Sequence, residues 1–134
     1  MTITHFRELE VWQLAMTLAK QVYQLAGTFP REERYGLIAQ LQRAAVSIPS
    51  NIAEGNARHG VREYARFISM AQGSCAELHT QLLLSGELQL GDAALIEDTL
   101  TTCDRVGRML LRLHRSLKQR LEAESRNPSP ESRS

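Results

Sequence analysis

Apolar residues recur at intervals of three and four along most of this chain, which is the spacing of amphipathic helices. The pattern predicts four helices, at about residues 7–26, 30–54, 61–88 and 92–123. Because short connections make successive helices antiparallel, we expect an all-α, antiparallel, up-down-up-down four-helix bundle over residues 1–124. Residues 125–134 contain Ser, Pro and charged side chains without an apolar face, so a disordered C-terminal tail is expected there.

The last two helices repeat in strict heptads, which are typical of left-handed bundle packing. The core positions expected in the third helix are Tyr64, Ile68, Ala71, Cys75, Leu78, Leu82 and Ser85. Those expected in the fourth are Ile96, Leu100, Cys103, Gly107, Leu110, His114, Leu117 and Leu121.

The second helix contains a proline, Pro49, in the middle of its apolar pattern. A proline there removes a backbone donor and clashes with the preceding turn, at a cost of roughly 3 kcal/mol. The apolar face nevertheless continues through it without a change of phase, at Tyr35, Ile38, Leu41, Ala45, Ile48 and Ile52. We therefore favour one helix kinked at Pro49. In the alternative, one helix ends near Ser47 and another begins with Asn51 as N-cap and Glu54 in the capping-box position.

The first helix carries two apolar stripes side by side. One consists of Leu9, Trp12, Met16, Ala19, Tyr23 and Ala26, and the other of Val11, Ala15, Leu18, Val22 and Leu25. A helix of a monomeric bundle needs only one apolar face, so the second stripe predicts a subunit interface. The alternative is one wide face buried between two neighbouring helices of the same chain.

Composition agrees with a small helical protein. The 134 residues fit one domain, aromatic residues make up only 5%, and β-branched residues are sparse. The chain shows no leader and no stretch of about 20 apolar residues, so a cytoplasmic protein is expected.

The two cysteines, Cys75 and Cys103, follow no metal-binding or redox spacing and are expected to be small buried side chains. Counting outward from the turn near Gly91 places Cys103 opposite Leu78 and Cys75 opposite Val106. This offset predicts that the cysteines form no intrachain disulfide.

The formal net charge is only +1, so any case for nucleic-acid binding depends on where the charges lie. The fourth helix holds Arg105, Arg108, Arg112, Arg115, Lys118 and Arg120 with no acidic residue between Arg105 and Leu121. In the bundle this row comes near Arg58, Arg62 and Arg66, whereas Glu32, Glu33, Glu87, Asp92, Glu97 and Asp98 gather at the opposite end. Our candidate phosphate contacts are Arg58, Arg62, Arg66, Arg112, Arg115 and Lys118. The alternative is a solvated charged surface.

Motifs of catalysis are missing from the sequence. The four histidines form no zinc or di-iron motif, and there is no phosphate-binding loop, nucleophile elbow or Cys-x-x-Cys. We therefore expect no enzyme activity, no cofactor and no metal. His114 is expected to be a buried core histidine. Glu54, near the end of a helix, is expected to pair with a cation such as Arg58 or Arg62.

Counting outward from the turn near Arg58 places Gln40 and Arg43 within reach of Glu77. These three residues are candidates for a half-buried polar cluster. In the alternative they face solvent and share no role.

Several sequence runs together resemble one known family. They include Phe29-Pro30, Tyr35-Gly36-Leu37, Arg43 to Pro49, Asn51 to Gly55, and Glu63-Tyr64 with Arg66-Phe67. These runs are similar to the bacterial four-helix-bundle family that includes the proteins encoded in intervening sequences of large-subunit ribosomal RNA. The resemblance covers about residues 6–90 and fades over the fourth helix. The residues that we take as its structural motif are Gln40, Arg43, Ser47, Pro49, Asn51, Glu54, Gly55 and Glu77.

The resemblance implies a homopentamer without enzymatic activity. A related branch, the accessory variability determinants of diversity-generating retroelements, forms basic pentamers that bind nucleic acid and a reverse transcriptase. We therefore expect a non-enzymatic oligomer that binds structured RNA, or DNA, or a ribonucleoprotein, with a ribosomal component or a reverse transcriptase as possible protein partner. The alternative is a protein-protein interaction adaptor that binds no nucleic acid.

Overall fold

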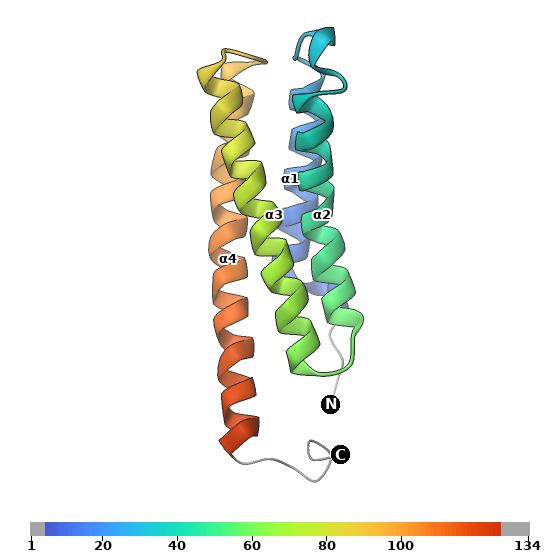
Figure 1. Cartoon of the computed structure of the whole chain (residues 1–134), viewed down its shortest axis with the longest axis vertical. Helices are drawn as coiled ribbons and strands as arrows, with labels where there is room; N and C mark the ends of the chain where they lie inside the picture. Colours follow the sequence, from blue (N-terminus) through green and yellow to red (C-terminus); the bar gives the residue numbers. More distant parts are fainter. Residues whose placement is uncertain (1–4, 127–134) are drawn as a thin grey trace.

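The computed structural model describes residues 5–126, and over this range the protein is all-α, as the sequence predicts. A short 3₁₀ helix, Phe6–Glu8, precedes α1 (Glu10–Ala26), and a second, Arg31–Glu33, precedes α2 (Leu37–Ala57). The remaining helices are α3 (Val61–Glu87) and α4 (Ala93–Arg126). The four long helices lie side by side as a bundle, and α4 extends past the connection between α2 and α3 (Figure 1).

Residue contacts define how the helices are paired. α2 packs against α1 and α3, and α4 packs against α3 and α1. Ser47 of α2 hydrogen-bonds Ser74 of α3, whereas Gly55, later in α2, lies against Phe67, earlier in α3. At the far end, Thr28 Oγ1 accepts a hydrogen bond of 2.9 Å from the backbone N–H of Asp92, which joins the connection after α1 to the one after α3. The bundle is therefore tied together at the end opposite to the α2–α3 connection (Figure 1).

Most of the predicted heptad positions of α3 and α4 form the core, whereas Tyr64, Leu100, Gly107 and Leu121 are only partly buried. In α3 and α4, the residues that are buried as expected are Ile68, Ala71, Cys75, Leu78, Leu82, Ser85, Ile96, Cys103, Leu110 and Leu117. His114, expected to be buried, is only half-buried. Tyr35, expected on the apolar face of the second helix, is 89% exposed because it precedes the first residue of α2.

The two stripes of α1 have different surroundings. Val11, Ala15, Leu18, Val22 and Leu25 are buried in the core. On the other stripe Trp12, Met16 and Ala19 are half-buried, and Tyr23 is 52% exposed. Phe6 packs edge-on against Trp12, with ring centroids 5.2 Å apart. The bundle thus buries one stripe fully and covers the other only in part.

The second helix begins later and ends later than the sequence suggests. Pro30 precedes a 3₁₀ turn, and α2 starts at Leu37, whose backbone N–H donates to the Glu33 carboxylate at 3.4 Å. That side chain thus satisfies a free backbone donor of the first turn of α2. Gly55, which directly follows the predicted end of the helix at residue 54, lies inside the helix, since α2 continues to Ala57.

Pro49 is buried within one continuous helix, so the reading with two helices is wrong. Side chains just after the proline donate to carbonyl groups just before it. Ser50 Oγ donates to the Val46 carbonyl at 2.8 Å, and Asn51 Nδ2 donates to the Ser47 carbonyl at 2.8 Å. The proline removes the donor of the Ala45 carbonyl, and these hydrogen bonds add donors to the next two carbonyl groups of the same turn, which helps to hold that turn in helical form. Asn51 is therefore a mid-helix residue and not an N-cap.

The expected offset between the two cysteines is wrong. Their Sγ atoms lie 3.8 Å apart across the α3–α4 interface. Cys75 also faces Gly107, where a Cβ would lie 3.6 Å from its sulfur. Each sulfur also lies near the backbone carbonyl oxygen of the other residue, so the two cysteines are level, and counting from the connection gives the wrong register between α3 and α4.

The C-terminal end of the bundle also differs from the prediction. α4 continues through Arg126, two residues beyond the expected boundary at 124. The rest of the predicted tail, 127–134, lies outside the described residues. Within the described range no helix has both the length and the apolar character needed to cross a membrane.

Candidate functional site

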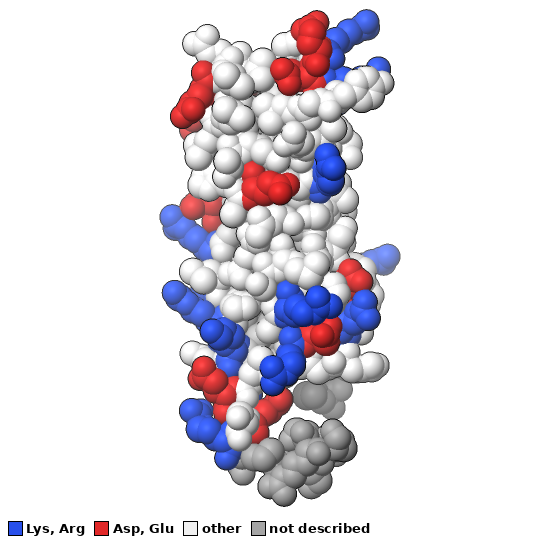
Figure 2. Space-filling view, viewed as in Figure 1, with Lys and Arg blue, Asp and Glu red and all other residues white. Residues whose placement is uncertain are grey.

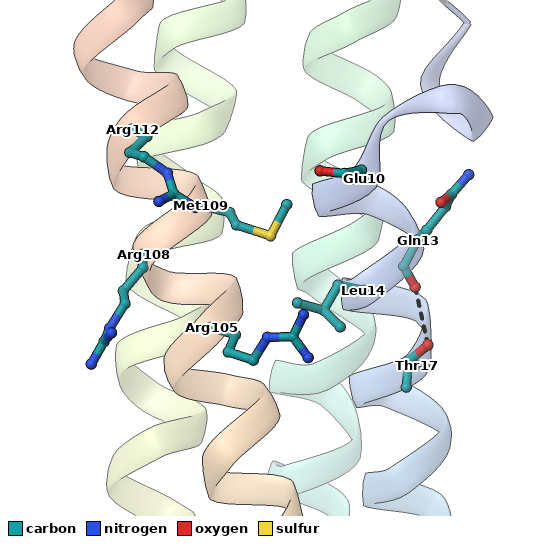
Figure 3. A pocket seen from close by; sticks show the side chains of 8 residues that line it. All are labelled: Glu10, Gln13, Leu14, Thr17, Arg105, Arg108, Met109 and Arg112. Atoms are coloured by element: carbon teal, nitrogen blue, oxygen red, sulfur yellow. Dashed lines mark hydrogen bonds between the residues drawn. The ribbon is translucent and has the colours of Figure 1, made fainter.

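A groove of about 520 Å³ runs between α1 and α4 (Figure 3). Arg105, Arg108 and Arg112 lie at i, i+3 and i+7 on one face of α4 and form one wall with Met109. The opposite wall, on α1, consists of Glu10, Gln13, Leu14 and Thr17. In Figure 3 the Arg105 guanidinium and the Met109 thioether point from α4 towards α1, whereas the Arg108 side chain turns away from the groove.

The groove carries an excess of positive charge. Its lining contains three arginines and one carboxylate, that of Glu10. Arg108 Nη2 is paired with Asp104 Oδ2 at 3.0 Å, on the outer side of α4. Over residues 5–126 no carboxylate lies within 4.0 Å of Arg105 or Arg112. These two guanidinium groups therefore keep their donors free for an anionic ligand.

A second group of arginines surrounds Phe67 near the α2–α3 connection. The guanidinium carbons of Arg58 and Arg66 lie 5.2 Å and 4.9 Å from the centroid of the Phe67 ring. Arg58 also pairs with Glu54 at 2.9 Å, as expected for Glu54, and Arg66 pairs with Glu63 at 3.4 Å. Each arginine is thus held in place by a ring and a carboxylate, and each is partly neutralised.

The remaining predicted phosphate contacts are exposed. Arg62 lies on α3 between Arg58 and Arg66 in sequence, and Arg115 and Lys118 continue the α4 row beyond the groove. Figure 2 shows most Lys and Arg side chains in the lower half of the molecule, with acidic side chains between them. The upper end of the view carries acidic clusters and a few basic groups. The charge separation is therefore partial.

The scan against protein families supplies an independent observation. The family model described as 23S rRNA-intervening sequence protein matches residues 7–112 of the chain. The protein belongs to this family. No curated protein matches the chain.

The family match extends further than the resemblance read from the sequence. That resemblance fades over the fourth helix, whereas the family match includes α4 through Arg112. All residues that line the α1–α4 groove are therefore inside the family region. Arg115 and Lys118 lie beyond it.

Several residues of the predicted family motif shape the bundle. Ser47 Oγ bonds Ser74 Oγ across the α2–α3 interface and donates to the Ala44 carbonyl at 3.2 Å. Gly55 is buried, and a Cβ there would lie 2.7 Å from Phe67 Cβ. These contacts place Ser47 and Gly55 of the motif at the α2–α3 interface.

Gln40, Arg43 and Glu77 form no half-buried cluster. All three are exposed, and within residues 5–126 no hydrogen bond or ion pair joins them. The contacts of Ser47 with Ser74 and of Gly55 with Phe67 place Arg43 about level with Leu78, next to Glu77 in sequence, so the cluster is absent because the three side chains face solvent. For this family member, the solvent-facing reading of the three residues is correct.

The sequence places Arg105 and Arg108 in the basic row of the fourth helix, but the predicted phosphate contacts do not include them. The apolar pattern does not show that α1 lies opposite this row, because Glu10, Gln13 and Thr17 look like solvated residues in the sequence. The i, i+3, i+7 spacing of the three arginines is the sequence feature that indicates a shared face on α4.

Among residues 5–126 no three His, Cys, Asp or Glu side chains converge as metal ligands.

Proposed function

We propose that this protein is a non-enzymatic, cytoplasmic RNA-binding protein that holds structured RNA, alone or within a ribonucleoprotein, on its basic surface. This surface is defined by the α1–α4 groove and the exposed cations around it: Arg58, Arg62, Arg66, Arg105, Arg112, Arg115 and Lys118. The observation that carries the proposal is the groove, where Arg105 and Arg112 line the α4 wall and neither has a carboxylate partner among the described residues.

The chemistry of the groove suits phosphate groups. A guanidinium donates two parallel hydrogen bonds to phosphate oxygens, and neutralising a phosphate releases bound counterions. Gln13 and Thr17 on α1 add polar groups to the opposite wall. Because side chains cannot read the deep, narrow major groove of an RNA helix, contacts with its phosphates would recognise shape rather than sequence. The name of the family, 23S rRNA-intervening sequence protein, is compatible with an RNA partner.

We further propose that the protein acts as a homo-oligomer, with a pentamer as the expected form. The partly covered stripe of α1 supports this assembly, since Trp12, Met16 and Ala19 stay half-buried and Tyr23 is half-exposed. A solution mass five times the 15.1 kDa of one chain is expected by light scattering. A mass of 15.1 kDa at micromolar concentration would refute the oligomer.

The RNA proposal is tested by fluorescence anisotropy with a labelled RNA stem-loop at low salt. The variant Arg105→Gln/Arg112→Gln removes the two unpaired guanidinium groups of the groove, and we expect its affinity to fall at least about tenfold. The matched control is Arg31→Gln/Arg34→Gln, which removes the same charge from exposed positions near the opposite end of the bundle. The control is expected to retain most of the affinity.

Two results would count against this proposal. Equal losses in both variants would mean that only net charge attracts the RNA. No binding by the wild-type protein at low salt would favour the adaptor function, in which exposed apolar side chains such as Val46, Met70 and Leu111 contact a protein partner.

A further inference from the structure

The thiols of Cys75 and Cys103 face each other and lie outside the proposed RNA-binding surface. Their Sγ atoms are 3.8 Å apart. Each sulfur also lies close to the backbone carbonyl oxygen of the other residue, at 3.5 Å for Cys75 and 3.7 Å for Cys103. These reciprocal contacts show that α3 and α4 approach closely here. Side-chain rotation can therefore bring the sulfurs to a disulfide bond length of about 2.05 Å.

A pocket connects this pair to solvent. It has a volume of about 320 Å³, lies between α3 and α4, and includes both cysteines in its lining. Gly107 forms part of its wall next to the Cys75 sulfur. Because Gly107 has no side chain, a small oxidant can reach the sulfur of Cys75, which is 6% exposed, before that of Cys103, which is 1% exposed.

The surroundings of the two sulfurs shift the pKa values of the two thiols in opposite directions. A hydrogen bond from the Cys103 thiol lowers the pKa of Cys75, although burial and the charge of Asp104 oppose this effect. The same hydrogen bond raises the pKa of Cys103, and burial adds to the increase. Cys75 is thus the thiol that ionises first and attacks an oxidant, since the thiolate is the nucleophile.

We propose that Cys75 and Cys103 are an oxidation site at which hydrogen peroxide forms an intramolecular disulfide between α3 and α4. The Cys75 thiolate attacks one peroxide oxygen, the O–O bond breaks, and a sulfenic acid and hydroxide form. This hydroxide takes up the proton that the Cys75 thiol released and becomes the first water molecule. The Cys103 sulfur then attacks the Cys75 sulfur, the S–O bond breaks, and the hydroxide that leaves takes the Cys103 proton as water. Both sulfurs are oxidised by one electron each, and the peroxide is reduced to two water molecules.

The test is intact-mass spectrometry of the full chain after treatment with hydrogen peroxide. We expect the loss of two hydrogen masses per chain, no free thiol after denaturation, and a linked peptide pair that contains both cysteines. A reductant should restore both thiols. The oxidised protein should also melt several degrees higher, because the disulfide restricts the unfolded chain. The chain has only two cysteines, so no other intrachain bridge competes.

Two variants make the test specific. In Cys103→Ser, oxidation should stop at a Cys75 sulfenic acid, which a dimedone probe traps. Gly107→Ala places a Cβ at ordinary contact distance from Cys75, so it should fold normally and slow the oxidation several-fold by narrowing the pocket. Two free thiols after treatment, disulfide-linked dimers, or a sulfinic acid on Cys75 in the wild-type protein would each overturn the inference. None of these results depends on RNA binding.

Discussion

Gly55 of α2 lies directly against Phe67 of α3, so closely that a Cβ on residue 55 would be 2.7 Å from Phe67 Cβ. This close contact leaves no room for a side chain at the buried position 55, which explains the glycine there. A glycine inside a helix otherwise costs roughly 0.5–1 kcal/mol of stability relative to alanine. The guanidinium groups of Arg58 and Arg66 both lie against the ring of the same Phe67. The α2–α3 contact thus positions part of the basic surface.

The first prediction concerns this contact. Gly55→Ala should destabilise the protein by about 1–3 kcal/mol, because the added methyl group forces α2 and α3 apart. The control is Gly73→Ala, since a Cβ on that exposed α3 residue meets no atom within 4 Å. The control should be neutral or stabilising by up to about 1 kcal/mol. Urea unfolding measures both, and equal stabilities of the two variants would disprove the close approach.

The second prediction concerns the turn at Pro49. Asn51→Ala removes a side-chain donor to the Ser47 carbonyl and should cost about 1 kcal/mol of unfolding free energy. Ser69→Ala serves as the comparison, because Ser69 is an exposed helical residue whose side chain makes no hydrogen bond within residues 5–126. It should change the stability by less than about 0.5 kcal/mol. If Asn51→Ala has no effect in the same urea titration, the account of how α2 tolerates its proline is wrong.

Much of the architecture could be predicted because the apolar spacing is regular. The heptads place Ile68 and Leu110 in the core, where both are fully buried. The register between helices could not be read from the sequence, since it depends on how closely small residues such as Gly55 and Gly107 let neighbouring helices approach. For that reason counting residues from the connections separated Cys75 from Cys103, which are in contact.

The candidate site was predicted only in part. The arginine row of α4 is visible in the sequence, but its partner wall is not, because Glu10 and Gln13 of α1 have the polar character of any solvated face. At the start of α2 the Glu33 carboxylate accepts a hydrogen bond from the backbone N–H of Leu37. The spacing of apolar residues gives no sign of this contact, so it does not predict where α2 begins.

The third prediction follows from the pKa of Cys75. The Cys103 thiol lowers that pKa, so Cys75 should react with iodoacetamide at lower pH than an ordinary cysteine. Cys103→Ala removes the donor, which raises the pKa of Cys75 and should shift its alkylation profile to higher pH. Cys103→Ser keeps a donor and should shift the profile less. The measurement is the alkylation rate against pH, and identical profiles in all three proteins would contradict the assigned direction.

The fourth prediction is a gain of affinity. Glu54→Gln and Glu63→Gln remove the carboxylates that are paired with Arg58 and Arg66. Since both ion pairs are exposed, the loss of stability should stay below about 1 kcal/mol. The freed guanidinium groups should tighten RNA binding several-fold at low salt. Glu32→Gln, an exposed acid near the opposite end, is the control with the same change in net charge. Weaker RNA binding by both variants would contradict the assigned surface.

The most direct test of the account is the affinity of the wild-type protein for a structured RNA as the salt concentration rises. If the basic surface contacts about four phosphates, the affinity should fall on the order of a hundredfold between about 50 mM and about 200 mM salt. The slope should be shallower for Arg105→Gln/Arg112→Gln, by roughly one unit for each contact removed. An affinity that does not change with salt, or equal slopes for the two proteins, would contradict RNA binding through this surface.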